Sequence, residues 1–223
     1  MKTHPPAARG LKSPGRKLFY VPVVHSAADM GTLAAPVARA YRARYGNERR
    51  LRKEKAIREM WAGIEKRLES LGLDFRTLKV YQDGLPVCGQ EEEIVRDLAE
   101  RGSANHSLLA RLIDQGARLV GTESPGLLLR EYEIAKAQLA GGAGARNGAE
   151  AAQQRAVLEE RDRFIARRID ETLAAGETGI LFIGILHGAN RYLPPDVQVE
   201  VVIYRLPFAN VSESSCPKGR SVR

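Results

Sequence analysis

The chain has few cysteines and lacks the apolar segments that would direct it to or through a membrane. Only Cys88 and Cys216 occur in 223 residues, without a CxxC pair, so neither a disulfide framework nor a zinc ribbon is indicated. The N-terminus carries positive charge and proline but no apolar segment of the signal-peptide kind, and no apolar run is long enough to span a bilayer. These absences predict a cytoplasmic protein with no membrane partner.

The length bounds the number of domains. A chain of 223 residues can bury a substantial core without help from a metal or a disulfide. We expect one α/β domain over residues 18–207, flanked by disordered basic tails at residues 1–17 and 208–223. The small, polar sequence of residues 140–149 predicts a flexible loop inside that domain.

Positive charge is in excess, with a formal net charge of +8 and a pI near 9.7. Clustered Lys and Arg can neutralise nucleic-acid phosphates and release their counterions. Much of the excess lies in the two tails and in one predicted helix, on a face that includes Arg49 and Arg58. Because a charge run on a helix is usually a solvated face, nucleic-acid binding through this helix is the minority interpretation.

Hydrophobic periodicity alternates between two kinds of element. Short apolar runs that begin near residues 18, 77, 117, 179 and 197 predict strands, and the last alternates as an edge strand does. Helical patterns cover residues 33–45, 48–71, 90–101, 103–115, 125–139 and 150–175. The sequence therefore predicts an α/β fold with a mostly parallel central sheet of about five strands flanked by helices, and a helical insertion after the first strand.

Two of the four histidines stand where an apolar run ends. His25 follows the run in KLFYVPVVHSAADMG, and His187 follows the run in GILFIGILHG. Asp83 and Glu123 end two further runs. Ligands of open parallel α/β sheets bind at the carboxyl ends of the strands, because loops and helix N-termini converge there. Function is therefore expected at that edge of the sheet.

Two imidazoles and a carboxylate are a common donor set for a divalent transition metal. We expect His25, Glu123 and His187 to hold such a metal, whose identity the residues leave open. A bound metal could activate water and polarise a carbonyl, which predicts hydrolysis of a small-molecule or peptide substrate. In the absence of metal, Glu123 beside a histidine could act as a general base on water.

Each candidate also has a simpler interpretation. The histidines could bond backbone groups at strand ends, and Glu123 could be a charge favoured at a helix N-terminus. Asp83 precedes Gly84 and has the character of a turn former. Asp29 could cap the helix that follows it.

Arginines are frequent in the helix that precedes the fourth strand. Arg161 or Arg168 could clamp an anionic group by a bidentate contact. The alternative is that these arginines lie at the surface, paired with neighbouring acids of the same helix.

Taken together, these motifs resemble the TraB/PrgY and TIKI superfamily, which also includes erythromycin esterase-like and ChaN-like proteins. That group has a histidine after the first strand, an acidic residue between, an arginine in a helix and a late GxxH. His25, Glu123, Arg161 and the Gly184/His187 pair occupy those places.

The resemblance implies a metal-dependent hydrolase, peptidase-like or esterase-like, of a kind found in bacteria. Glu123, His187 and Arg161 would be its catalytic residues. Pro22 stands where the group has a glycine before the first histidine, and Asp162 stands where it often has asparagine. Some relatives bind ligands such as haem, so a non-enzymatic ligand- or metal-binding regulator on the same fold is the first alternative. A basic nucleic-acid-associated protein is the second.

Overall fold

The computed structural model describes residues 15–140 and 148–204. The predicted tails fall almost wholly outside these ranges, as does most of the predicted loop. Within them the chain forms a five-stranded sheet in the order β3-β2-β4-β1-β5, in which every pair of neighbours is parallel. The predicted α/β class and parallel sheet are confirmed. The strands are β1 (Arg16–Val23), β2 (Leu78–Pro86), β3 (Arg118–Glu123), β4 (Thr178–Gly184) and β5 (Val197–Val201).

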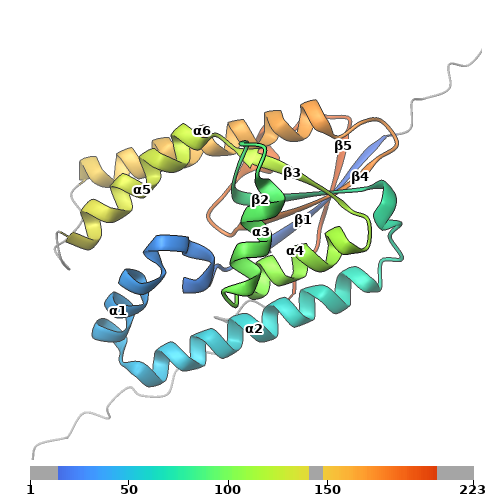
Figure 1. Cartoon of the computed structure of the whole chain (residues 1–223). Helices are drawn as coiled ribbons and strands as arrows, with labels where there is room; N and C mark the ends of the chain where they lie inside the picture. The colour runs from blue at the N-terminus through green and yellow to red at the C-terminus, as the bar shows by residue number, and fades with distance from the viewer. Residues whose placement is uncertain (1–14, 141–147, 205–223) are drawn as a thin grey trace, which may run out of the picture.

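Six α-helices flank this sheet (Figure 1). Short 3-10 helices lie in the connections: η1 (Ala27–Leu33) between β1 and α1, η2 (Phe75–Thr77) between α2 and β2, and η3 (Ala189–Tyr192) between β4 and β5. The α-helices are α1 (Ala34–Tyr45), α2 (Asn47–Glu69), α3 (Glu91–Glu100), α4 (Ala104–Asp114), α5 (Pro125–Ala140) and α6 (Gly148–Thr172). The first two form the predicted helical insertion between β1 and β2.

Local sequence signals explain several of these boundaries. The Ser103 hydroxyl accepts a hydrogen bond from the backbone N–H of His106 at 3.1 Å, and so caps α4 as expected. Pro125 begins α5, where its missing N–H has no helical partner to lose. Gly46, with φ +81°, separates α1 from α2, because a residue without a side chain adopts that conformation at little cost.

The two faces of the sheet bury separate cores. One face packs on α2, α3 and α4, and its large buried side chains include Trp61 and Phe182, whose ring centroids lie 5.8 Å apart. The other face packs on α6, through Ile165, Ile169 and Leu173. Alternate side chains of a strand point to opposite faces, so the apolar run of β4 supplies both cores.

The large apolar side chains of α2 are buried from Ile57 onward. Leu51, nearer the start of the same helix, is instead 50% exposed. The reason is that the first half of α2 extends past the sheet beside α1, at the lower left of Figure 1. That part of α2 therefore contributes nothing to the core.

Pro22 lies in β1, a strand with neighbours on both sides. The pairing of β1 with β5 ends at Tyr20 and Val201. Pro22 therefore stands beyond the last residue pair of that ladder, where a missing backbone donor disturbs the sheet least.

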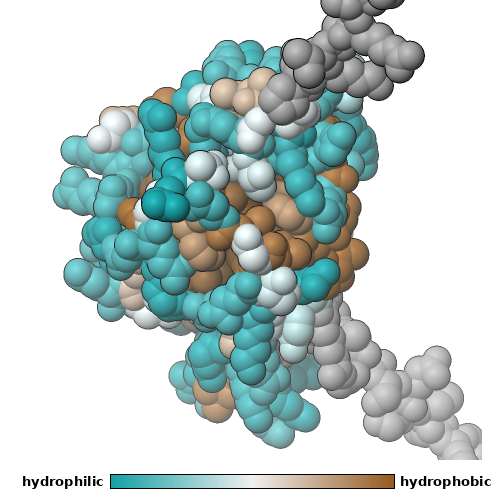
Figure 2. All heavy atoms as spheres, turned by 90° about the vertical axis from the view of Figure 1, so that its right-hand side faces the viewer, coloured by the Kyte–Doolittle hydropathy of each residue, from teal (hydrophilic) through white to brown (hydrophobic). Residues whose placement is uncertain are grey.

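The edge strand β5 exposes apolar side chains. Val201 is 53% exposed and Ile203, just after the strand, is 68% exposed. An area of apolar surface is visible on the side of the molecule seen in Figure 2.

In the part of the chain that the structure describes, no helix is both long and apolar enough to cross a membrane.

Candidate functional site

The strand order decides which polar side chains meet. His25 follows β1, His187 follows β4, and Asp83 lies on β2, and these are the three neighbouring central strands. Glu123 ends β3, which lies on the far side of β2 from β4. At about 4.8 Å between neighbouring strands, β3 is about 10 Å from β4 and about 14 Å from β1. Of the two strand carboxylates, Asp83 is therefore the one that lies close to both histidines.

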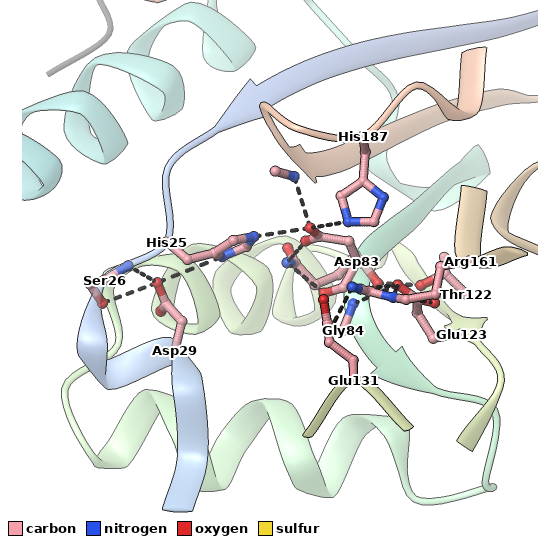
Figure 3. A network of polar contacts seen from close by, with 12 residues as sticks. His25, Ser26, Asp29, Asp83, Gly84, Thr122, Glu123, Glu131, Arg161 and His187 are labelled. Atoms are coloured by element: carbon pink, nitrogen blue, oxygen red, sulfur yellow. Dashed lines mark hydrogen bonds and ion pairs between the residues drawn. The ribbon is translucent and has the colours of Figure 1, made fainter. Parts of the chain in front are cut away.

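Asp83 is the centre of this cluster (Figure 3). Its Oδ2 atom lies 3.0 Å from Nε2 of His25 and 3.7 Å from Nε2 of His187. The same oxygen accepts the backbone N–H of Gly184 at 2.8 Å. The pairing of β2 with β3 shifts register between Gln82 and Pro86, and Gly84 within the shift has φ +75°. This irregularity lies beside Asp83, which the sequence suggested was only a turn former.

Gly184 ends β4 and lies beside the contact between Asp83 and His25. A Cβ atom at this position would lie 3.2 Å from Asp83 Oδ2 and 3.4 Å from His25 Nε2. The first separation is tighter than an ordinary van der Waals contact of carbon, and the second is at the lower limit of one. The glycine of the FIGILHG motif thus leaves room for the two side chains to approach.

A second carboxylate fixes the orientation of His187. Asp162 of α6 accepts a hydrogen bond from Nδ1 of His187 at 2.6 Å, assigning the proton to that nitrogen, and accepts the Gly188 N–H at 2.8 Å. This leaves Nε2 as the ring nitrogen that faces Asp83. The His187 side chain is only 6% exposed, so α6 and the loop after β4 hold it firmly.

His25 has a supporting carboxylate as well. Nδ1 of His25 lies 3.8 Å from Asp29 Oδ2, and the same oxygen accepts the backbone N–H of Ser26 at 2.6 Å. The other oxygen of Asp29 accepts the Ser103 hydroxyl at 2.5 Å. Asp29 thus lies inside η1 and bonds back to Ser26, the N-cap of η1, instead of capping the helix that follows it as the sequence suggested. Asp29 also ties the loop that carries His25 to α4.

These contacts set the charges of the cluster. Burial lowers the pKa of His25, but the charge of Asp83 and the contacts with Asp29 outweigh burial and raise that pKa to about 10. Burial raises the pKa of Asp83. The charges of His25 and His187, together with the hydrogen bonds from His25 and the Gly184 N–H, outweigh burial and lower that pKa to about 2. The pKa of Asp29 also lies well below its usual range, because the nearby imidazoles of His106 and His25 and the hydrogen bond from Ser103 outweigh the effect of burial. At neutral pH an imidazolium at His25 thus faces an ionised Asp83.

Glu123 belongs to a different contact. Its carboxylate accepts hydrogen bonds from Arg161 Nε at 3.1 Å and Nη2 at 2.5 Å, and from the backbone N–H of Gly84 at 3.2 Å. Arg161 Nη1 also donates to Glu131 of α5 at 2.7 Å. The side chains of Glu123 and Arg161 are 0% and 5% exposed. Arg161 is thus a buried partner of Glu123 and no surface residue, whereas Arg168 lies partly exposed and pairs with Glu171 at 3.0 Å.

The predicted metal set of His25, Glu123 and His187 does not assemble in this arrangement. Arg161 and Gly84 donate to Glu123, and none of its hydrogen bonds or ion pairs within the described residues involves a histidine. Across residues 15–140 and 148–204, no group of three or more His, Cys, Asp or Glu side chains is placed to hold a metal ion. Metal binding by these residues stays a prediction of the sequence.

Sequence reasoning found His25 and His187 but gave Asp83 and Asp162 minor parts. Both carried a signal in the sequence: Asp83 follows an apolar run as the histidines do, and Asp162 directly follows Arg161 in the motif. A surface hollow lined by residues 89–93 and 116–119 lies beside α3 and β3 and includes none of these side chains.

The cluster contacts solvent mainly through His25, because the His25 side chain is 31% exposed while those of Asp83 and His187 are 4% and 6% exposed.

Comparisons with known proteins do not assign this chain to a family. Searches of the chain against protein-family models, curated proteins and solved structures found no match. The fold and site thus define a parallel α/β protein with a histidine–aspartate cluster at the carboxyl ends of its central strands. The resemblance to the TraB/PrgY and TIKI superfamily stays a prediction from the motifs.

Proposed function

We propose that this protein is a hydrolase of ester or amide bonds that uses His25, Asp83 and His187 for acid–base chemistry. One observation carries the proposal: the Nε2 atoms of two histidines face the same buried carboxylate oxygen, at 3.0 and 3.7 Å. Perturbed pKa values beside one another at a sheet edge are typical of reactive sites. Core histidines that only satisfy backbone groups would not need a shared buried carboxylate.

His187 is suited to the role of general base. The hydrogen bond to Asp162 keeps the ring proton on Nδ1, so that Nε2 of the neutral ring can take a proton from water. As that proton transfers, the water oxygen attacks the acyl carbon. Asp162 and Asp83 both stabilise the imidazolium that forms on His187.

His25 is suited to the opposite role. A pKa of about 10 keeps its ring protonated at neutral pH, and its partial exposure allows contact with a bound substrate. The positive charge stabilises the negative charge that develops on the carbonyl oxygen when water attacks the acyl carbon. As the bond to the leaving group breaks, His25 donates a proton to the leaving oxygen or nitrogen, and exchange with solvent restores both rings.

The proposal is tested with the full chain and a panel of p-nitrophenyl esters and fluorogenic peptide amides. Each assay is run in EDTA and, separately, with added Zn²⁺ or Mn²⁺. We expect turnover in EDTA that falls by 10²-fold or more in His25→Ala, His187→Ala and Asp83→Asn variants, the range of general acid–base contributions. Asp97→Asn, on the surface of α3, is the matched control and should keep the wild-type rate.

Other outcomes separate the alternatives. Turnover that needs added metal would overturn the metal-free steps and favour the metal-dependent hydrolase predicted from the sequence. Absence of turnover on every substrate, with or without metal, would contradict hydrolysis of these bonds and favour the non-enzymatic ligand-binding alternative. Elemental analysis of protein purified without chelator, beside the His25→Ala/His187→Ala variant, would then test for a bound metal.

A further inference from the structure

The hairpin formed by α1 and the first half of α2 is strongly basic. Residues 34–58 contain nine Lys or Arg and two Glu, a net charge of +7, and the whole chain carries +8. The other 198 residues are thus close to neutral in sum. This hairpin lies at the lower left of Figure 1, and α1 buries none of its side chains.

Most of these cations are unneutralised. Arg50 pairs with Glu54 at 2.6 Å and Arg52 with Glu48 at 2.9 Å, which uses both acids of the hairpin. A further set of arginines is exposed and makes no ion pair with any residue that the structure describes. This set is Arg39, Arg42, Arg44, Arg49 and Arg58.

Aromatic rings lie among the cations. Tyr41 and Tyr45 have ring centroids 4.7 Å apart, and Nζ of Lys53 lies 4.7 Å from the Tyr41 ring. The Lys53 contact joins α2 to α1 and stiffens the hairpin. Tyr45 is 41% exposed at the end of α1, with the Arg44 guanidinium 5.3 Å from its ring centroid, so a base that approached this ring would meet a cation as well.

Like charges held this close repel one another, and their repulsion is relieved when an anionic polymer displaces counterions from them. We propose that the hairpin of residues 34–58 binds the phosphate backbone of nucleic acid without sequence preference. This interaction is independent of the hydrolytic site. The exposed surface of the hairpin favours nucleic acid over a membrane, because a helix that lies in a lipid interface needs an apolar face to insert. Here the large exposed apolar side chains are only Tyr45 and Leu51.

The test measures salt-dependent binding by the full chain. A fluorescein-labelled 30-nucleotide single strand of mixed sequence, and its duplex, are titrated in 50, 100 and 200 mM KCl with anisotropy as the readout. If about five phosphates are neutralised, the slope of log K against log salt should be about −3.5 for the single strand, a loss of about 10²-fold in affinity between 50 and 200 mM.

A matched pair of variants locates the surface. Replacing Arg39, Arg42, Arg49 and Arg58 by Gln should make the slope shallower by about 3 and weaken binding by at least tenfold at 50 mM KCl, at about 0.7 per neutralised phosphate. The control replaces Arg76, Arg101, Arg163 and Arg167 by Gln, which removes the same charge from exposed sites elsewhere. Its slope should stay within about 1 of the wild-type value.

Three results would overturn the proposal. One is no measurable binding of either probe at 50 mM KCl. Another is an equal loss in both variants, which would show that net charge and not the hairpin attracts the probe. The third is that the protein binds vesicles of phosphatidylserine and phosphatidylcholine but does not bind the oligonucleotides. Circular dichroism melting of both variants confirms that they remain folded.

Discussion

Asp162 holds His187 by one ring nitrogen: its Oδ1 atom lies 2.6 Å from Nδ1, while its Oδ2 accepts the N–H of the next residue, Gly188, at 2.8 Å. The carboxylate thus clamps both the ring and the backbone of the loop after β4. A histidine held in this way presents only Nε2 to the rest of the site.

Replacing Asp162 by Asn should remove the preference for a proton on Nδ1. If hydrolysis is observed, we expect kcat for Asp162→Asn to fall by about 10²-fold or more, within the range for general acid–base catalysis, with a smaller change in KM. Steady-state kinetics on the best substrate of the panel measures both. Asp170→Asn, on the same helix but paired with Arg16 at the surface, should leave kcat unchanged, and an equal fall there would argue against the orienting role.

Removing Arg161 should destabilise the protein, because Glu123 would be left buried and ionised without its partner. We expect Arg161→Met to lower the free energy of unfolding at pH 7 by about 3–5 kcal/mol. Urea denaturation followed by Trp61 fluorescence measures the change. Arg163→Met, two residues away and paired at the surface with Glu159, should cost about 1 kcal/mol or less.

The Arg161→Met defect should also depend on pH. Burial raises the pKa of Glu123, opposed mainly by the charge and hydrogen bonds of Arg161. Without Arg161 the carboxyl should protonate more readily, so part of the lost stability should return as pH is lowered from 7 to 5. A loss that stays constant over this interval would show that packing, rather than an unpaired charge, explains it.

Stability should fall in alkali through the titration of His25. The folded pKa of about 10 lies above the ordinary value of about 6.5, so the folded state binds the proton more tightly. Its stabilisation is complete below about pH 6.5 and is lost as pH rises through about 10, at up to about 1.4 kcal/mol per pH unit. Urea denaturation of wild type and His25→Gln over this interval should show the difference between them shrinking, and a constant difference would contradict the raised pKa.

The contribution of Asp83 to stability should depend on pH in the acid range. Its folded pKa of about 2 lies below the ordinary value of about 3.9, so its stabilisation is present above about pH 3.9 and is lost as pH falls toward 2. Asp83→Asn should therefore be less sensitive to acid than the wild type. Denaturation curves at pH 5, 4 and 3 measure this, and parallel losses in both proteins would contradict it.

Gly184→Ala should force Asp83 and His25 apart. The new Cβ would lie 3.2 and 3.4 Å from their oxygen and nitrogen atoms, and overpacking of this kind typically costs about 1–3 kcal/mol. NMR titration of His25 should also show its pKa moving down, since the charge of Asp83 would be more distant. Gly126→Ala in α5 meets only Ser124 Oγ at 3.8 Å and should leave stability and that pKa unchanged.

Most of the fold could be predicted because its signals are local. Apolar runs marked the strands, and Ser103 and Pro125 marked helix starts that the structure confirms. Strand order is not a local property: β4, fourth along the chain, inserts between β1 and β2. Without that order, the sequence favoured Glu123 as the partner of the histidines, and only the placement of β2 beside β4 points to Asp83 instead.

The placement of β1 has a consequence for how the protein folds. In the described sheet β1 pairs only with β4 and β5, so Leu18 pairs with Gly179 and Val199. Contacts between residues this distant along a chain form slowly, because a long loop must close before any pairing stabilises it. During synthesis β1 must therefore wait, unpaired, until about 160 further residues have been added. The histidine–aspartate cluster cannot exist before then, so any reactivity it has is withheld from incomplete chains.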